Sequence, residues 1–276
     1  MAETDTNPTK AAGQSAHVLE SAQHIHLLGL DIHNFTMDET LLAIAEIVER
    51  RKFAFAVTPN VDHTMKLRKN AKFRELYAKA GLVVADGMPL IWAAKLLGTP
   101  LKDRISGADL FVRTCSMAAQ NGYSVFLLGG SPGAAQLACE KLEAMFPTLK
   151  IAGWDCPPYG FAKDEEQNRT IQQKIRESGA DILFVGLGAP LQEEWMCDYG
   201  EGSGVAFAIG VGVSFSFMGG VIKRAPLWMQ RSGLEWLWRL LKEPRRLWKR
   251  YLVEALPFFG MLLHAMLKRN APQRHA

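Results

Sequence analysis

The chain has 276 residues and a net charge of +4, and 48% of its residues are hydrophobic while 22% are charged. This composition excludes a disordered chain, because enough apolar side chains are present to form a core. The four cysteines lie far apart, with no Cys-x-x-Cys pair and no histidine cluster nearby, which argues against a disulfide framework or a zinc site.

The first 22 residues are polar, include acidic side chains and lack the apolar run of a signal peptide. We expect a loose tail over 1–22 and a protein that stays in the cytosol. The chain is then expected to divide into a core at 23–222 and a C-terminal helical appendage at 223–276.

Short β-like runs alternate with helix-like runs in the core. The expected strands lie at 24–32, 53–59, 81–87, 123–130, 150–155, 181–188 and 205–213. The expected helices lie at 37–51, 61–80, 89–98, 108–122, 131–146, 165–179 and 190–200. Buried runs separated by helices long enough for crossovers predict an α/β fold, a Rossmann-like three-layer sandwich with a mostly parallel sheet.

The stretch 204–222 is uncharged over about the length of a transmembrane helix. Five glycines and two serines interrupt it. We therefore expect a buried strand that runs into a glycine turn rather than a membrane span.

The residues just after the predicted strands are candidates for a binding site, because ligands of such sheets lie beyond the carboxyl ends of the strands. They are rich in glycine and polar groups and include Thr58, Asn60, Asp86, Gly129, Gly130, Gly186 and Gly188. Each glycine alone could simply close a turn, but together they favour a nucleotide-sized ligand. Ser131 is expected to cap the next helix, with Pro132 at its first position.

The sequence lacks the usual nucleotide fingerprints. No G-x-G-x-x-G fits the first strand–helix turn, and no P-loop is present, so a nicotinamide cofactor is not predicted. No Asp-x-Asp pair is present to hold a divalent ion against a diphosphate. We expect neither a metal nor a cofactor, and expect helix N-termini and arginines to neutralise any bound diphosphate.

The appendage concentrates positive charge. Residues 223–250 include nine basic and two acidic side chains, a local charge of +7, which leaves −3 on the rest of the chain. Such a block can bind nucleic acid, an anionic membrane surface or a phosphorylated substrate, and charge alone does not choose among them.

Helical spacing from Gly233 places four leucines on one stripe, with tryptophans beside them, before Pro244 interrupts the helix. A second helix from Arg245 joins tryptophan and tyrosine to more basic residues. This pattern is typical of helices that lie in the headgroup region of a membrane. The alternative is a helical hairpin packed on the body or on a second subunit, so a homo-oligomer is left open.

Several blocks, in order, resemble the WecG/TagA/CpsF glycosyltransferases. They are TPN (58–60), VVADGMPLIWAAKLLG (83–98), RISGADLF (104–111), FLLGGSPG (126–133), GLGAPLQEEW (186–195) and RAPLWMQRSGLEWLWRLLKEPRRLWKRY (224–251). The resemblance implies metal-independent, inverting transfer of a sugar from a UDP-sugar donor to a polyprenyl-diphosphate-linked sugar, in cell-surface polysaccharide biosynthesis. The sugar would be N-acetylmannosamine, its uronic acid or glucose.

The same resemblance implies a peripheral protein on the cytoplasmic face of the inner membrane, with no nucleic-acid partner. The residues alone leave another class open. This is a nucleotide- or nucleic-acid-binding α/β module whose basic tail grips phosphates in a salt-sensitive way.

The resemblance also assigns roles by position. Asp86 matches the proposed general base, and the alternative is a cap for the helix near Pro89. Arg104 would steady the diphosphate, or else be a surface cation. Thr58 and Asn60 would line the same pocket. Gln192 would contact hydroxyls of the donor or acceptor, and the alternative is that it caps its helix.

Two further groups of residues complete the expected site. Arg231, Arg239 and Arg246 are the appendage arginines expected to meet the diphosphate of donor or acceptor. Ser216 stands where many members of the family carry an aspartate that contacts the donor. By contrast, Asp62 and His63 are expected to be surface polar residues.

Overall fold

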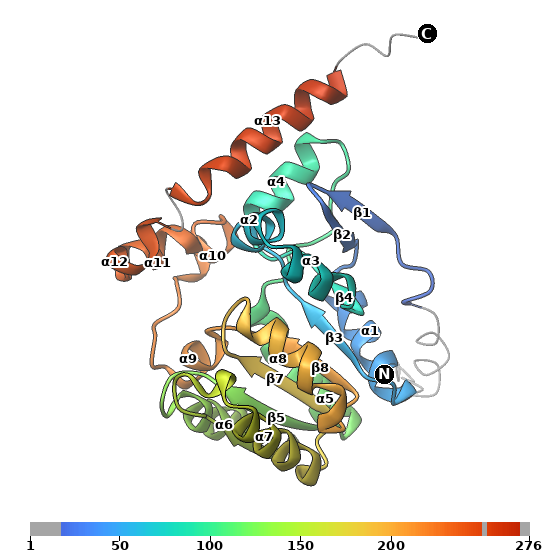
Figure 1. The fold of residues 1–276 in the computed structure, drawn as a ribbon, viewed down its shortest axis with the longest axis vertical. Coiled ribbons are helices and arrows are strands. Elements are labelled where there is room, and N and C mark those ends of the chain that lie inside the picture. Colours follow the sequence, from blue (N-terminus) through green and yellow to red (C-terminus); the bar gives the residue numbers. More distant parts are fainter. Residues whose placement is uncertain (1–17, 250–252, 271–276) are drawn as a thin grey trace, which may run out of the picture.

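A parallel sheet between two layers of helices forms the body of the protein (Figure 1). The computed structural model describes residues 18–249 and 253–270, and within them this sheet has six strands. Their order is β4 (Leu82–Val83), β3 (Ala54–Val57), β8 (Phe207–Gly210), β7 (Ile182–Gly186), β5 (Ser124–Gly129) and β6 (Lys150–Asp155), with every neighbouring pair parallel. The predicted three-layer α/β fold is confirmed.

The strands are apolar on both faces because both faces are covered. Alternate residues of β5 illustrate this: Phe126 and Leu128 pack into one hydrophobic cluster, and Val125 and Leu127 pack into the other. All four side chains are almost fully buried.

Each face of the sheet has its own helices. One face is covered by α1 (Met37–Arg50), α5 (Gly107–Asn121), α6 (Ala134–Met145) and α9 (Ser214–Gly219). The other is covered by α2 (Val61–Lys69), α3 (Ala71–Ala78), α4 (Met88–Leu96), α7 (Glu165–Ser178) and α8 (Leu191–Tyr199). Two short 3-10 helices, Phe161–Lys163 and Glu201–Ser203, lie between these elements.

Three local predictions were wrong. The expected strand 24–32 is a hairpin, β1 (His24–Leu27) and β2 (Leu30–His33), because Leu28 and Gly29 both take positive φ and reverse the chain. The expected helix 61–80 is two helices, because Asn70 is extended and its side chain caps α3. The helix expected from 131 begins at Ala134, after a left-handed Gly133.

Within 204–222 the predicted buried strand is present as β8, and a turn follows it. The short helix α9 after that turn was not predicted. No helix in the part of the chain that the structure describes is long and apolar enough to cross a membrane.

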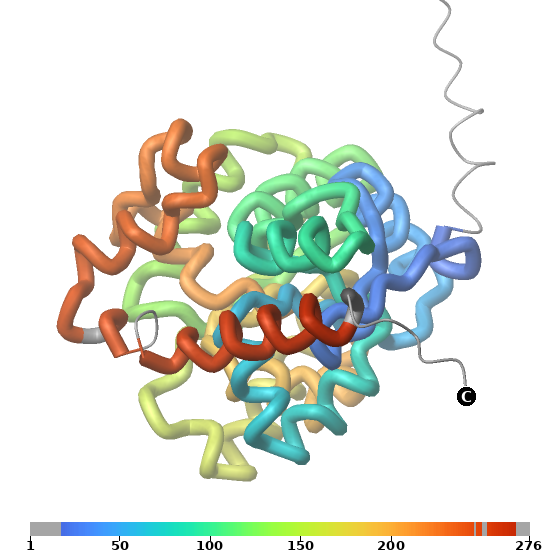
Figure 2. The backbone as a smooth tube through the Cα atoms, turned by 90° about the horizontal axis from the view of Figure 1, so that it is seen from above, coloured from blue at the N-terminus to red at the C-terminus, as the bar shows by residue number. Residues whose placement is uncertain are grey.

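The C-terminal helices are α10 (Leu227–Arg231), α11 (Glu235–Lys242), α12 (Pro244–Trp248) and α13 (Leu256–Asn270). Pro244 does end the α11 segment, since it is the first residue of α12. Helix α13 contacts α2 and crosses the molecule there, as the view from above shows (Figure 2). Its Phe258 is fully buried in the cluster on that face of the sheet. The division at 22 and 222 stays a prediction, and residues 1–17, 250–252 and 271–276 lie outside the described residues.

Candidate active site

A cleft of about 950 Å³ lies at the carboxyl ends of the strands, between the sheet and the C-terminal helices. Many of the residues predicted from the sequence line it: Thr58, Asn60, Asp86, Arg104, Gly130, Gly186, Gly188, Gln192, Ser216 and Arg239. The structure therefore brings together residues that are up to 181 positions apart, between Thr58 and Arg239.

Three predicted residues are placed differently. Gly129 is the last residue of β5 and lies behind the lining; a side chain there would collide with Leu187 and the Gly186 carbonyl. Arg231 is exposed on α10 and is not among the lining residues. Arg246 lies in α12, but its side chain falls outside the described part of the chain.

Asp86 lies three residues beyond the end of β4, and its backbone N–H donates to the Pro59 carbonyl at 2.8 Å. Its carboxylate accepts a hydrogen bond from the N–H of Gly107, the first residue of α5, at 3.4 Å. Helix α4 begins after Gly87 without any side-chain cap, so the alternative role of Asp86 as a helix cap does not apply. Asp86 instead faces the cleft at the start of α5.

Burial raises the pKa of Asp86 from 3.8 to about 6, and the Arg104 guanidinium and the Gly107 N–H only partly oppose the rise. At neutral pH the carboxylate is therefore mostly ionised, yet basic enough to accept a proton. A carboxylate with these properties at the mouth of a cleft is a candidate general base.

Asn60 begins α2 and uses its side-chain oxygen to accept hydrogen bonds from the N–H groups of Asp62 and His63. This bonding fixes the amide so that its NH₂ group remains for the cleft. Asp62 and His63 were predicted to lie on the surface, and that prediction was wrong. The Asp62 side chain is only 11% exposed and lines the cleft. His63 is buried because α3 packs over it, and its ring bonds to the Tyr77 hydroxyl.

Gln192 holds two strand-end turns together from the first turn of α8. Its side-chain oxygen accepts hydrogen bonds from the N–H groups of Gly188 and Gly212, both at 3.1 Å. Its NH₂ group donates to Glu193 at 2.9 Å, and both side chains are buried. The amide therefore shapes the backbone that lines the cleft.

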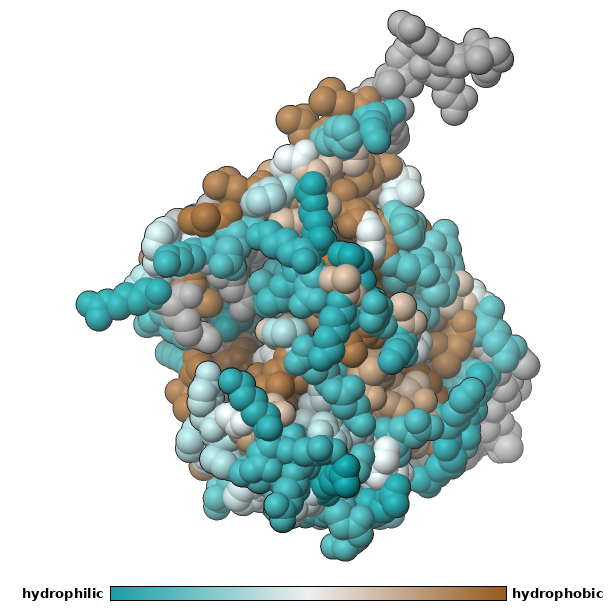
Figure 3. Space-filling view, viewed as in Figure 1, coloured by the Kyte–Doolittle hydropathy of each residue, from teal (hydrophilic) through white to brown (hydrophobic). Residues whose placement is uncertain are grey.

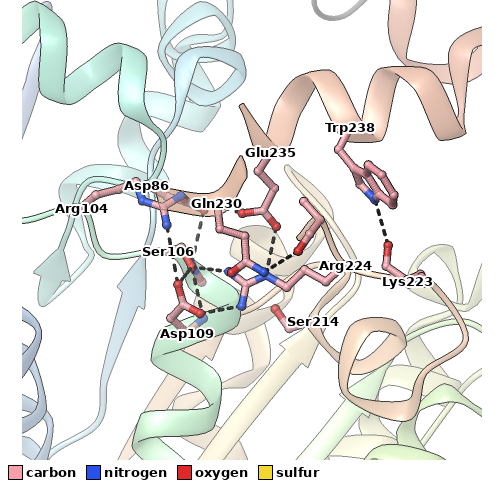
Figure 4. Close-up of polar contacts among 12 residues, drawn as sticks. Asp86, Arg104, Ser106, Asp109, Ser214, Lys223, Arg224, Gln230, Glu235 and Trp238 are labelled. Carbon is pink, nitrogen blue, oxygen red and sulfur yellow. Dashed lines mark hydrogen bonds and ion pairs between the residues drawn. The ribbon is translucent and has the colours of Figure 1, made fainter. Parts of the chain in front are cut away.

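Four charged side chains beside Asp86 alternate in sign (Figure 4). Arg224 bonds to Asp109 at 2.5 Å and to Glu235 at 3.0 Å, and Arg104 lies 3.8 Å from each of the same two carboxylates. We call Arg104, Asp109, Arg224 and Glu235 the charge ring. It joins the core, through α5, to the first turn of α11.

At another part of the cleft, the hydroxyls of Ser131 and Ser216 lie 3.1 Å apart. Ser131 was predicted to cap the helix, and that prediction was wrong. It lies in the turn after β5, and its hydroxyl bonds to Ser216 of α9. Two hydroxyls thus line the cleft at the place where many members of the family carry an aspartate.

Comparison with known proteins identifies the family of this chain. The model of the Glycosyl transferase WecG/TagA/CpsF family matches residues 25–272. The chain belongs to this family. It is therefore an enzyme, a glycosyltransferase.

Curated relatives of this glycosyltransferase share one name, N-acetylglucosaminyldiphosphoundecaprenol N-acetyl-beta-D-mannosaminyltransferase. The chain is 35% identical to the one from Bacillus spizizenii over 74% of its own length and 77% of the relative's. It is 29% identical to the one from Bacillus subtilis over the same shares. It is 28% identical to one from Staphylococcus aureus over 85% of its own length and 90% of the relative's.

Sequence reasoning missed several residues of the glycosyltransferase that line the cleft or lie just behind its lining. Glu193 lies behind Gln192, where burial raises its pKa from 4.5 to about 7, and its second oxygen has no hydrogen-bond partner among the described residues. Arg224 and Glu235 lay in the basic block and in the segment 224–251 that resembles the family, but neither was predicted as a site residue. The available signal was that Glu235 is one of only two acids in that block.

The described residues include no group of three or more His, Cys, Asp or Glu side chains placed to hold a metal ion. Metal independence of this glycosyltransferase stays a prediction from the resemblance.

Proposed function

We propose that this glycosyltransferase moves a sugar of the N-acetylmannosamine type from a UDP-sugar to a sugar linked through diphosphate to a polyprenyl lipid. The names of the relatives support N-acetylmannosamine as the type of sugar transferred and a lipid-linked sugar as the acceptor. The single observation that carries the mechanism is Asp86, a carboxylate with a pKa of about 6 in a cleft large enough for a nucleotide sugar.

In this reaction an acceptor hydroxyl attacks the anomeric carbon from the side opposite the UDP group. The new C–O bond forms as the bond to the UDP oxygen breaks, UDP leaves with the bonding electrons, and the hydroxyl proton passes to Asp86. Attack from the opposite side inverts the anomeric centre, so a donor with α-linked UDP gives a β-linked product. A positioned base is usually worth about two to four powers of ten in rate.

The leaving diphosphate gains negative charge as the bond breaks, and groups that bind this charge lower the barrier. Arg104 and Arg239 line the cleft and are the candidates. The glycine turns after β5, β7 and β8 expose backbone where a phosphate can approach closely. These groups require no metal ion to neutralise the diphosphate.

A lipid-linked acceptor would bring the enzyme to a membrane surface, and we propose that α13 meets it. Four apolar side chains at helical spacing, Leu256, Phe259, Leu263 and Leu267, are 56–63% exposed along one stripe of α13. Figure 3 shows apolar surface gathered at this end of the molecule. Leu256 and Phe259 also line the cleft, so the stripe leads from the surface to the site.

Basic and aromatic side chains are also exposed on the helices that precede α13. Lys242, Arg245 and Lys249 are exposed on α11 and at α12, together with Trp228 and Trp248. Lysines and arginines attract anionic lipid headgroups, and tryptophan favours the headgroup region. This combination supports peripheral binding to the cytoplasmic leaflet, which is rich in anionic lipid.

A radiolabelled transfer assay tests the proposal. The purified full chain is mixed with UDP-N-acetylmannosamine and a polyprenyl-diphosphate-linked N-acetylglucosamine, in the presence of a chelator. We expect a labelled lipid product with a β linkage, and the same yield when magnesium replaces the chelator. No product with any UDP-sugar would refute the proposed donor class, and product only with magnesium would refute metal independence.

A further inference from the structure

The charge ring contains one cation that has no assigned part in the reaction. Arg224 lies in the segment between α9 and α10. Its guanidinium is mostly buried, with 21% of the side chain exposed. Its contacts are with protein groups on both sides: Asp109 and Ser106 at the start of α5, and Glu235 at the start of α11. A cation on the protein surface is usually well exposed to water, whereas the Arg224 side chain is largely buried and bonds to three protein groups.

The two carboxylates of the ring are divided between the two arginines. Asp109 offers Oδ1 to Arg224 at 2.5 Å and Oδ2 to Arg104 at 3.8 Å. Glu235 offers Oε1 to Arg224 at 3.0 Å and Oε2 to Arg104 at 3.8 Å. Arg224 thus holds both acids at hydrogen-bond distance, and Arg104 is held only loosely.

This division matters because Arg104 faces the cleft. Two carboxylates against one arginine would leave a net negative charge there and would compete with any phosphate for Arg104. With Arg224 in place, the four charges of the ring sum to zero.

We propose that Arg224 is a positioning residue of the transfer reaction: it draws Asp109 and Glu235 away from Arg104, which leaves Arg104 available to the diphosphate, and it fastens α11 over the cleft. Arg224 acts through the ring and need not touch substrate. The inference rests on the proposed function for the role of Arg104.

Three members of the charge ring act on the pKa of Asp86, which burial raises. Arg104 from the preceding loop lowers the pKa of Asp86, and Asp109 of α5 and Glu235 of α11 raise it, while the Gly107 N–H lowers it. Loss of Arg224 leaves two acids against one arginine, a net negative charge beside Asp86, so the pKa of Asp86 should rise. Loss of the Glu235 charge should lower it.

The test compares Arg224→Met, Arg224→Lys, Glu235→Gln and the double variant Arg224→Met/Glu235→Gln in the transfer assay over pH 5–9. We expect Arg224→Met to lose about tenfold or more in kcat/KM, with the midpoint of the acid limb above that of the wild type. Glu235→Gln should move the midpoint below it, and the double variant should return toward the wild-type midpoint. Arg224→Lys keeps the positive charge but replaces the forked guanidinium by a single ammonium group. Its kcat/KM and midpoint should therefore lie between those of Arg224→Met and the wild type.

Arg113→Met is the matched control, because it removes an exposed arginine of α5, the helix that carries Asp109. Arg113 pairs with Asp38 at 2.6 Å, away from the cleft. It should leave the midpoint where it is. A folded Arg224→Met with wild-type kcat/KM and midpoint would overturn the proposal. If that variant does not fold, a wild-type midpoint in both Arg224→Lys and Glu235→Gln would overturn it as well.

Amide hydrogen exchange without substrate separates failure of this inference from failure of the proposed function. Exchange in α11 should rise in Arg224→Met and stay unchanged in Asp86→Asn, whichever sugar is transferred. If the wild type transfers no sugar but α11 exchanges faster only in Arg224→Met, the proposed function fails and the fastening role stands. Unchanged exchange in α11 of Arg224→Met would refute the fastening role.

Discussion

The side-chain oxygen of Gln192 accepts a hydrogen bond from the N–H of Gly212 at 3.1 Å, which ties the first turn of α8 to the turn after β8. The same oxygen accepts from Gly188 in the turn after β7. One buried amide therefore sets the distance between two backbone segments that line the cleft. Because these two segments line the cleft, loss of the amide should weaken binding of the nucleotide sugar.

Gln192→Ala should loosen both turns, since two backbone N–H groups lose their acceptor. We expect a loss of about 1–3 kcal/mol in the free energy of unfolding and a higher KM for the nucleotide sugar. Urea unfolding and donor titration measure the two effects. Gln173→Ala is the control, because Gln173 is exposed on α7 and its side chain donates to Glu177, on the same helix, at 2.8 Å. Equal unfolding free energies for the two variants would contradict the role given to Gln192.

Glu193→Gln should change how stability depends on pH. The folded protein holds the pKa of Glu193 at about 7, above the ordinary 4.5, because the carboxyl is buried. The stability from this group is therefore complete below about pH 4.5 and is lost as pH rises through 7. Glutamine does not titrate, so the variant should gain on the wild type between pH 5 and pH 8, by up to about 3 kcal/mol.

Urea unfolding of both proteins at pH 5 and pH 8 measures this difference, and comparing the two cancels the other titrating groups. Glu194→Gln is the control, since Glu194 is half-buried and lies 3.8 Å from Lys72. The same difference in stability at both pH values would show that Glu193 does not carry the raised pKa.

Replacement of Leu256, Phe259, Leu263 and Leu267 by serine should weaken binding to anionic lipid vesicles at least about tenfold, because each apolar side chain loses favourable transfer into the membrane. Vesicle flotation measures the bound fraction. The control replaces Leu137 and Met145, exposed apolar residues of α6, by serine, and should bind as the wild type does. Figure 1 shows α6 at the end of the molecule opposite α13. Equal flotation of all three proteins would contradict a membrane-facing α13.

The sequence was sufficient for much of the fold and for the lining of the cleft. Buried β runs alternating with helices predicted the parallel sheet, and the rule that ligands lie at the carboxyl ends of strands predicted Asn60 and Asp86 as neighbours. It failed where a single turn decided the outcome, as at Leu28–Gly29, whose positive φ angles split a strand into a hairpin.

The charge ring lay beyond the reach of the sequence for a different reason. Asp109 and Arg224 are 115 residues apart, and no periodicity connects an acid in the first turn of α5 with an arginine in a loop. Glu193 was hidden likewise, since an ionisable residue beside a polar one on an amphipathic helix is usually exposed. Only packing shows that it is buried.

The pH dependence of kcat/KM for sugar transfer by the wild type and Asp86→Asn tests the central claim most directly. Activity requires the ionised carboxylate, so it should fall as pH drops through about 6, the pKa of Asp86. Asp86→Asn should be slower by about two to four powers of ten and should lack this acid limb, while still binding the nucleotide sugar. Turnover of Asp86→Asn at the wild-type rate, or an unchanged acid limb in that variant, would contradict the assignment of Asp86 as the base.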